Sequence, residues 1–227
     1  MNDDIEMIDC SNSTWMGRSR TGWEINAREA SRTMFDESTI RGKLQRKELQ
    51  WVLSCVARDT NGPLKILDAG CGPGRYLRAL SRMGHQVVGY DFSRNMLELC
   101  KGDAADSHAV FIQGEIQHEP FKDGQFDIVL MLDVLHHLQS QQMRARAIEE
   151  AFRVSRCRVI VDIKNGLNPV LWYRYRRQND SLPRRAYTYR EIGGLISRNG
   201  GHISRSVGLG FPARIIAPYI LIEALKA

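Results

Sequence analysis

Three alternate glycines, Gly70, Gly72 and Gly74, follow a short apolar stretch that ends at Ala69. Glycine permits tight bends and lets the main chain approach a ligand where a Cβ would clash. The apolar residues before the glycines predict a buried strand, and the periodic residues after them predict a helix. In open α/β sheets, ligands bind in the crevice beyond the carboxyl end of such a strand. The segment therefore predicts an α/β fold with a ligand site at its first strand.

The rest of the chain continues this alternation of strands and helices. Strands are predicted at residues 64–69, 86–90, 108–113, 126–132, 157–163 and 202–209, and helices at 23–58, 74–83, 94–100, 141–154 and 189–198. The pattern predicts a doubly wound, mostly parallel, Rossmann-like sheet with right-handed crossovers. Two regions depart from it. Residues 165–190 read as irregular, and residues 211–227, which contain two prolines, predict an atypical C-terminus without a convincing seventh strand.

A length of 227 residues suits one well-cored domain with an extension. We expect a flexible tail at residues 1–22 and a single domain at 23–227. Within that domain, residues 23–60 are predicted to be N-terminal helices and residues 61–163 a cofactor-binding core. Residues 164–227 are predicted to form an acceptor-side insertion and the C-terminal region.

Acidic residues follow each of the first three predicted strands or lie at their ends. Asp68 precedes the glycines, whose spacing differs from the dinucleotide fingerprint, and it favours a cationic or hydroxyl-bearing ligand over a phosphate. Asp91 ends the second strand, where an acid of this fold class accepts hydrogen bonds from ribose hydroxyls. Glu115 follows the third strand and is placed to accept an adenine amino group. The alternatives are a purely structural turn, a helix cap at Asp91 and a surface acid at Glu115.

Four ordered motifs resemble the class I S-adenosylmethionine (SAM)-dependent methyltransferases, and in particular the branch that includes ubiquinone- and menaquinone-biosynthesis enzymes. The motifs are LDAGCGPG (67–74), GYD (89–91), PFKDGQFDIV (120–129) and DVLHHL (133–138), and the resemblance covers residues 64–163. It implies the class I methyltransferase fold, SAM as cofactor and methyl transfer as the activity.

The resemblance also implies roles for individual residues. The three glycines would cradle the cofactor with Asp91 on the ribose, Glu115 on the adenine, and the backbone of Met131 and Leu132 beside the methionine moiety. The full expected cofactor set is Asp68, Gly70, Cys71, Gly72, Gly74, Asp91, Phe92, Met96, Glu115, Ile116, Met131 and Leu132. Phe92 and Met96 would pack on the adenine, although isolated residues of these types are more often core. Arg28 or Arg32 is the expected partner of the cofactor carboxylate.

His136 and His137 follow the fourth predicted strand, close to the expected position of the methyl group. A hydroxyl acceptor would gain from a general base, and histidine has a suitable pKa. We expect His137, rather than His136, to face the cleft. The alternative is a packing or hydrogen-bonded histidine without a catalytic role.

The cysteines and the N-terminus exclude several classes of protein. Five widely spaced cysteines without a Cys-x-x-Cys pair predict neither a disulfide framework nor a metal site. Residues 1–10 are acidic and lack the apolar core of a secretory signal, and no run is long enough to span a membrane. These features predict a cytoplasmic protein with reduced thiols.

The methyl acceptor has to be inferred from the basic C-terminal third. From Arg153 onward there are 14 Lys and Arg against 4 Asp and Glu. Aromatic and basic residues interleave in LWYRYRR (171–177) and RRAYTYR (184–190). Together with the apolar C-terminus, they predict a small-molecule acceptor that is lipid-linked or isoprenoid, met through peripheral membrane contact of residues 171–190.

Other functions stay open at this point. An RNA methyltransferase is the rival, since arginines and aromatic side chains also bind nucleic acid, although nucleic acid is the less favoured partner. A non-catalytic SAM-binding subunit is the third hypothesis, and a nicotinamide-dependent oxidoreductase is disfavoured by the glycine spacing. The sequence predicts no oligomeric state.

Overall fold

The computed structural model describes residues 36, 38–59, 62–103, 109–138, 140–177, 185–211 and 214–227. The predicted tail at residues 1–22, together with Arg28 and Arg32, lies outside this range. The chain divides into two compact units, Met1–Pro120 and Phe121–Ala227. The first carries the glycine loop, and the second carries the two histidines and the basic C-terminal third.

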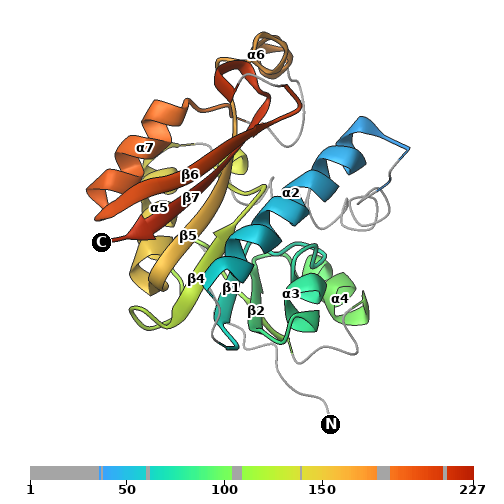
Figure 1. Cartoon of the computed structure of the whole chain (residues 1–227), viewed down its shortest axis with the longest axis vertical. Coiled ribbons are helices and arrows are strands. Elements are labelled where there is room, and N and C mark those ends of the chain that lie inside the picture. Colours follow the sequence, from blue (N-terminus) through green and yellow to red (C-terminus); the bar gives the residue numbers. More distant parts are fainter. Residues whose placement is uncertain are drawn as a thin grey trace. The chain divides into compact units, whose positions relative to one another are not determined.

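The first unit alternates strands and helices in chain order (Figure 1). Its elements are α2 (Ile40–Val56), η1 (Ala57–Asp59), β1 (Lys65–Ala69), α3 (Leu77–Arg82), β2 (Gln86–Asp91), α4 (Arg94–Asp103) and β3 (Val110–Gln113). β1 pairs with β2 and β2 with β3, both in parallel register, with Asp68 opposite Gly89 and Asp91 opposite Gln113. The carboxyl ends of these strands therefore meet at one edge, where the predicted acids lie.

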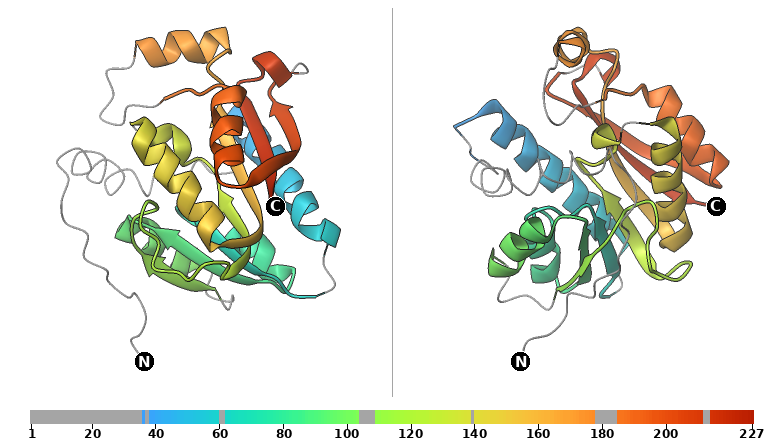
Figure 2. Two further views of the ribbon diagram at one scale, coloured as in Figure 1. Left: turned by 90° about the vertical axis from the view of Figure 1, so that its left-hand side faces the viewer. Right: turned by 180° about the vertical axis from the view of Figure 1, so that it is seen from behind.

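The second unit combines parallel and antiparallel strands. Its elements are β4 (Phe126–Met131), η2 (Leu135–His137), α5 (Gln141–Val154), β5 (Ser155–Lys164), α6 (Pro169–Arg176), α7 (Tyr189–Arg198), β6 (Gly201–Leu209), η3 (Arg214–Ile216) and β7 (Tyr219–Lys226). β4 pairs with β5 in parallel, whereas β7 runs antiparallel to both β5 and β6. In two views, α5 and α7 lie side by side on one face of these strands (Figures 1 and 2).

The strands form a mixed seven-stranded sheet in the order β3-β2-β1-β4-β5-β7-β6. The doubly wound α/β fold predicted from the alternation is confirmed. β1 and β4 are buried along almost their whole length, which explains their near-continuous apolar sequences. The largest fully buried side chains are Ile66, Leu67, Leu77, Leu80, Tyr90 and Leu97 in the first unit, and Leu130, Met131, Leu135, Ile148, Ile160 and Ile163 in the second.

Residues 219–226 form β7, the seventh strand for which the sequence offered no convincing signal. The two prolines at positions 212 and 218 had left a helix as an alternative for this segment. In the structure Glu223 is fully buried and its Oε1 lies 3.2 Å from Nε of Arg158 on β5. Pro218 precedes the strand, where it removes no ladder hydrogen bond.

The reading of residues 165–190 as irregular is also wrong in part, because α6 occupies residues 169–176. Asn168 caps this helix by accepting a hydrogen bond from the Leu171 amide, and Pro169 stands at its first position, where a missing N–H costs nothing. Leu171 is the single buried residue of the helix. The apolar periodicity that identifies most helices is therefore absent. In the described part of the chain, no helix combines the length and apolar character needed to span a membrane.

Candidate functional site

The glycine loop is fastened to the end of β2 by main-chain hydrogen bonds. The amides of Gly70 and Cys71 both donate to the carbonyl of Tyr90, at 2.6 and 3.1 Å. Gly70, Gly72 and Gly74 have φ values of 79°, 52° and 83°, in the left-handed region that other residues rarely adopt. A Cβ on Gly74 would lie 2.3 Å from Sγ of Cys100, whereas one on Gly72 would meet nothing within 4 Å. Gly74 is therefore required by packing, and Gly72 presents open backbone.

Asp91 organises the loop from the end of β2. Its Oδ2 accepts a hydrogen bond of 2.8 Å from the Gly72 amide, and its Oδ1 accepts one of 2.9 Å from Ser93. The cap of α4 is Ser93, whose Oγ accepts from the Met96 amide at 3.2 Å. A carboxylate offers about four lone-pair positions, so one acid at this place can hold more than one donor at a time.

The loop after β3 lies directly beside the loop after β2. The Gly114 amide donates to the Asp91 carbonyl at 3.1 Å, and the Tyr90 hydroxyl donates to the Glu115 carbonyl at 3.1 Å. A Cβ on Gly114 would lie 2.2 Å from that hydroxyl, so glycine is required there. Glu115 is buried rather than a surface acid. The structure thus brings Asp91 and Glu115 to one edge of the first unit.

The remaining expected cofactor contacts differ in exposure. Met96 and Cys71 are buried, whereas Phe92 and Ile116 keep part of their surface exposed. A hydrogen bond with the Cys100 thiol, together with burial, raises the pKa of Cys71, so it is an unreactive thiol. Met96 is a core residue of α4, while Phe92 is free to offer part of its ring.

Asp68 is the most unusual acid of this edge. It is 1% exposed, and its Oδ2 has no hydrogen-bond partner among the described residues. Burial raises the pKa of its carboxyl to about 7; the charge of Arg75 opposes this rise, and that of Asp91 adds to it. A buried carboxylate without a partner is costly, so a cationic ligand at this position would relieve it.

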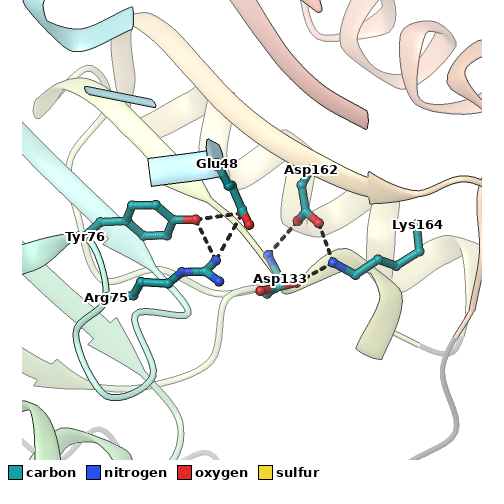
Figure 3. Close-up of polar contacts among 6 residues, drawn as sticks. All are labelled: Glu48, Arg75, Tyr76, Asp133, Asp162 and Lys164. Atoms are coloured by element: carbon teal, nitrogen blue, oxygen red, sulfur yellow. Dashed lines mark hydrogen bonds and ion pairs between the residues drawn. The ribbon is translucent and has the colours of Figure 1, made fainter. Parts of the chain in front are cut away.

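Sequence reasoning missed a buried polar cluster that joins α2 to the glycine loop (Figure 3). Nη2 of Arg75 donates to Oε1 of Glu48 at 3.1 Å and to the hydroxyl of Tyr76 at 2.5 Å, and that hydroxyl donates to Glu48 at 2.7 Å. All three residues are buried. The available signal was the position of Arg75, directly after the third glycine, but its partner on α2 is 27 residues away.

In the second unit, η2 places the two histidines next to each other. His136 is buried and His137 is partly exposed, with ring centroids 3.9 Å apart. His137 is thus the more exposed of the two rings. Met131 and Leu132 precede them and are buried, so only their backbone could contact a ligand.

A second buried cluster, also missed from the sequence, joins the ends of β4 and β5 (Figure 3). Lys164 donates to Oδ2 of Asp162 at 2.8 Å and also to Oδ1 of Asp133. The Asp133 amide donates to Oδ1 of Asp162 at 2.5 Å, and Asp133 is the only non-glycine residue in the described part of the chain with a positive φ, 60°. Burial raises the pKa of Asp162, and the charge of Lys164 opposes that rise. Strained backbone of this kind is often found at functional sites.

Asp133, His136 and Asp162 offer three ligand atoms within 4.8 Å of one another, a set that could hold a metal ion. However, the Lys164 ammonium already bridges the two carboxylates. The cluster thus carries its own cation, and the residues do not favour a second one.

Residues 67–158 match the family profile described as a methyltransferase domain. This part of the chain is therefore similar to a methyltransferase domain. Probable tRNA methyltransferase 9B of Homo sapiens is 33% identical over 89 residues, which are 39% of this chain and 18% of that protein. Ubiquinone biosynthesis O-methyltransferase of Bradyrhizobium diazoefficiens is 38% identical over 78 residues, 34% of this chain and 31% of that enzyme. The matched part of this chain thus spans well under two thirds of the length of these curated relatives.

Solved structures match a larger share of this chain. Magnesium protoporphyrin IX methyltransferase from Synechocystis, crystallised with S-adenosylhomocysteine, superimposes with a TM-score of 0.76 at 20% identity, covering 93% of this chain and 100% of that one. At this identity the likeness concerns the fold. The fold is that of the class I SAM-dependent methyltransferases, as the motifs implied.

Proposed function

We propose that this protein is a SAM-dependent methyltransferase that acts on a small-molecule acceptor. The observation that carries the proposal is the buried Asp68 carboxylate, whose Oδ2 lacks a partner directly before the open backbone of the glycine loop. The family match over residues 67–158 supports the same reading.

The chemistry of the acids fits the parts of SAM. The cofactor has a cationic amino group and a sulfonium, two ribose hydroxyls and an adenine amine. Asp68 supplies a partner for a cation, Asp91 acceptor capacity for hydroxyls, and Glu115 an acceptor for an amine. Gly72 offers backbone where no side chain blocks approach.

Bound SAM would supply a methyl group on a sulfonium, and the thioether S-adenosylhomocysteine would leave as the acceptor bonds to the methyl carbon. The chain has to bind SAM and the acceptor, orient them toward each other and exclude water. Orientation alone can lower such a barrier by up to about 7–11 kcal/mol, so no catalytic triad is needed. The hydrogen bonds from Gly72 to Asp91 and from Gly114 to Asp91 make the cofactor edge rigid before a ligand arrives.

His137 remains our candidate for a general base toward a hydroxyl acceptor, with His136 as its buried neighbour. Asp133 is a second candidate, because its carboxylate is 35% exposed and is oriented by Lys164. We expect His137→Ala to lower turnover about 10²–10⁴-fold without loss of cofactor binding if it acts as the base. Unchanged turnover in His137→Ala together with a loss in Asp133→Asn would assign the role to Asp133.

For the acceptor we propose O-methylation of a lipid-linked or isoprenoid metabolite. The identity of 38% with a ubiquinone biosynthesis O-methyltransferase supports this class. Incubation with SAM carrying a tritiated methyl group and a cell extract, followed by partition between organic solvent and water, tests it. Label in the organic phase is the expected result, and label confined to the aqueous phase contradicts it.

RNA is the second candidate acceptor, favoured by the identity of 33% with a protein named as a probable tRNA methyltransferase. Label in acid-precipitable, ribonuclease-sensitive material would identify it. Binding of tRNA that weakens steeply with salt would accompany it, since phosphate contacts release counterions.

The cofactor claim is tested by thermal unfolding with and without S-adenosylhomocysteine, for the parent, Asp68→Asn and Asp91→Ala. A ligand at 100 times its dissociation constant should stabilise the parent by about 2.7 kcal/mol. We expect a clear shift in the parent and a reduced one in both variants. Glu98→Gln, at an exposed acid paired with Arg94 on α4, is the matched control and should keep the parent shift. Absence of a shift in the parent would refute cofactor binding by the isolated chain.

A further inference from the structure

Exposed apolar side chains gather at one end of the second unit. Ten large apolar residues are exposed in the described part of the chain, and seven of them come from two short segments of this unit. The first segment is α6 with the turn before it, and the second is the connection between β6 and β7. The seven residues, which we call the α6 patch, are Leu167, Val170, Trp172, Tyr173, Phe211, Ile215 and Ile216.

The two segments lie about 40 residues apart in the sequence but are held together in space. Nδ2 of Asn168 donates to the Ile216 carbonyl at 2.7 Å, and Nδ2 of Asn165 donates to the Ile215 carbonyl at 2.9 Å. Both views show α6 beside the β6–β7 connection (Figures 1 and 2). The two segments of the α6 patch therefore lie next to each other, which the sequence of residues 171–190 alone did not reveal.

The exposure of this surface is high for a folded protein. Val170 is 71% exposed, Ile215 is 68% exposed, and Trp172 and Tyr173 are about half exposed. Leu171 is the one residue of α6 that packs inward. A contiguous apolar surface rimmed by polar groups marks a site of interaction with another body.

The charged residues within the two segments that carry the patch are all basic. Arg174, Arg176 and Arg177 project from α6, and Arg214 begins η3 directly before Ile215. No acidic residue occurs between residues 165 and 177 or between 192 and 222. Beside η3 lies a shallow hollow of about 360 Å³, lined by Tyr189, Ile203, Ser204, Arg205, Ser206 and Arg214, which adds cationic groups on this side. The partner is therefore anionic.

The kinds of side chain distinguish a lipid surface from a nucleic acid. The aliphatic members, Leu167, Val170, Ile215 and Ile216, cannot stack on bases but can enter an acyl boundary. The guanidinium of Arg176 lies 4.9 Å from the Trp172 ring centroid, and that of Arg177 lies 4.6 Å from the Tyr173 ring centroid. An arginine thus covers one face of each ring, which leaves a single face of each ring open for stacking.

We propose that the α6 patch binds the surface of an anionic lipid bilayer. Trp172 and Tyr173 suit the headgroup level, where aromatic rings with polar edges concentrate. Val170 and Ile215 enter the acyl boundary, while the long arginine side chains reach the lipid phosphates. The site lies wholly within the second unit and requires neither cofactor nor acceptor.

Vesicle sedimentation of the full chain tests the proposal. The probes are vesicles of phosphatidylcholine alone and of phosphatidylcholine mixed with phosphatidylglycerol. We expect binding to the mixed vesicles, weakened at least about tenfold by Arg176→Glu with Arg177→Glu and by Val170→Asp with Ile215→Asp. The matched controls are Arg82→Glu and Ile40→Asp, at exposed positions of the first unit, and these should bind as the parent does.

Equal binding to both kinds of vesicle overturns the anionic preference, and equal binding by patch and control variants overturns the site. If the parent binds bulk tRNA but no vesicles, and the patch variants lose the tRNA binding, the partner of the α6 patch is nucleic acid and not a bilayer. Unchanged unfolding temperatures of the exposed variants exclude misfolding as the cause. Because S-adenosylhomocysteine is absent from this assay, its failure leaves the proposed function standing.

Discussion

Oδ2 of Asp91 lies 2.8 Å from the amide nitrogen of Gly72 and accepts its hydrogen bond. One carboxylate thus fixes the middle of the glycine loop from the neighbouring strand, while its Oδ1 holds Ser93 at the start of α4. The residue expected to bind the ribose is therefore also the residue that shapes the loop. The effect of replacing Asp91 therefore has to be measured on both the free energy of unfolding and the binding of the cofactor.

Asp91→Ala should lower the free energy of unfolding by about 3 kcal/mol, because two amides lose a charged acceptor in a buried position. It should also abolish stabilisation by S-adenosylhomocysteine. Asp91→Asn keeps one acceptor oxygen and should fall between the parent and the alanine variant. Urea unfolding measures the first effect and calorimetric titration the second. An alanine variant that binds with parental affinity would remove Asp91 from the cofactor site.

Gly72 and Gly74 should respond differently to alanine. At Gly72 the added Cβ meets open space, so Gly72→Ala should cost about 1–2 kcal/mol of backbone strain at its φ of 52°. At Gly74 the Cβ would lie 2.3 Å from Sγ of Cys100, so Gly74→Ala should cost about 3 kcal/mol or more.

Ligand binding should show the reverse order, because the open backbone at Gly72 is where we place the cofactor. Adding Cys100→Ala to Gly74→Ala should recover part of the lost stability, since the contact between the two sites is removed. Parallel urea unfolding and calorimetry of the parent and these three variants measure both quantities. Equal losses of affinity at Gly72 and Gly74 would contradict the proposed cradle.

Asp68 should make the protein less stable as the pH rises. Burial raises the pKa of its carboxyl to about 7, above the ordinary value of 3.8. Between these values the folded state keeps a proton that the unfolded state has lost. Stability therefore falls as the pH rises from about 4 to 7, by an amount on the order of 4 kcal/mol at full effect.

Asp68→Asn carries no titrating proton and should lose this dependence. The variant should exceed the parent in stability at pH 8 but bind SAM more weakly, because the cationic amino group loses its partner. The affinity of the parent for SAM should rise with pH through about 7, with release of a proton on binding. Urea unfolding and titration calorimetry at pH 5 and pH 8 measure these effects, and a parent and a variant with parallel stability profiles would refute the assignment.

The sequence predicted local features well where capping and periodicity agree. α5 and α7 begin and end where they were expected, because Ser140 and Thr188 cap them by accepting hydrogen bonds from the Met143 and Glu191 amides. The acids at the ends of β2 and β3 were found for a similar reason, since parallel strands place their carboxyl ends at one edge.

Features that depend on distant pairing were missed. β7 was not identified, because two prolines stand in or before the segment and because its buried Glu223 pairs with Arg158, a partner 65 residues away. The cluster of Glu48 with Arg75 likewise joins elements that share no sequence pattern. α6 was missed for the opposite reason, because its apolar side chains face outward and leave no core-facing period.

Among the residues of the second unit, we expect replacement of Lys164 to lower the free energy of unfolding most. It is buried and bridges Asp162 and Asp133, so Lys164→Met leaves Asp162 as an uncompensated buried acid. We expect a loss of about 3–5 kcal/mol. Lys122→Met, at an exposed position, is the control and should change stability by less than about 0.5 kcal/mol.

The pH dependence of the Lys164→Met variant separates this electrostatic cause from a packing defect. Burial already raises the pKa of Asp162, and removal of Lys164 takes away the charge that opposes the rise. The loss in the variant should therefore be smallest at low pH, where Asp162 is protonated in both states, and should grow as the pH rises. Adding Asp162→Leu should recover stability at high pH, because it replaces the unpaired acid by an apolar side chain. A loss that is the same at pH 4 and pH 8, measured by urea unfolding, would point to packing alone and would end the case for Lys164 as the internal cation.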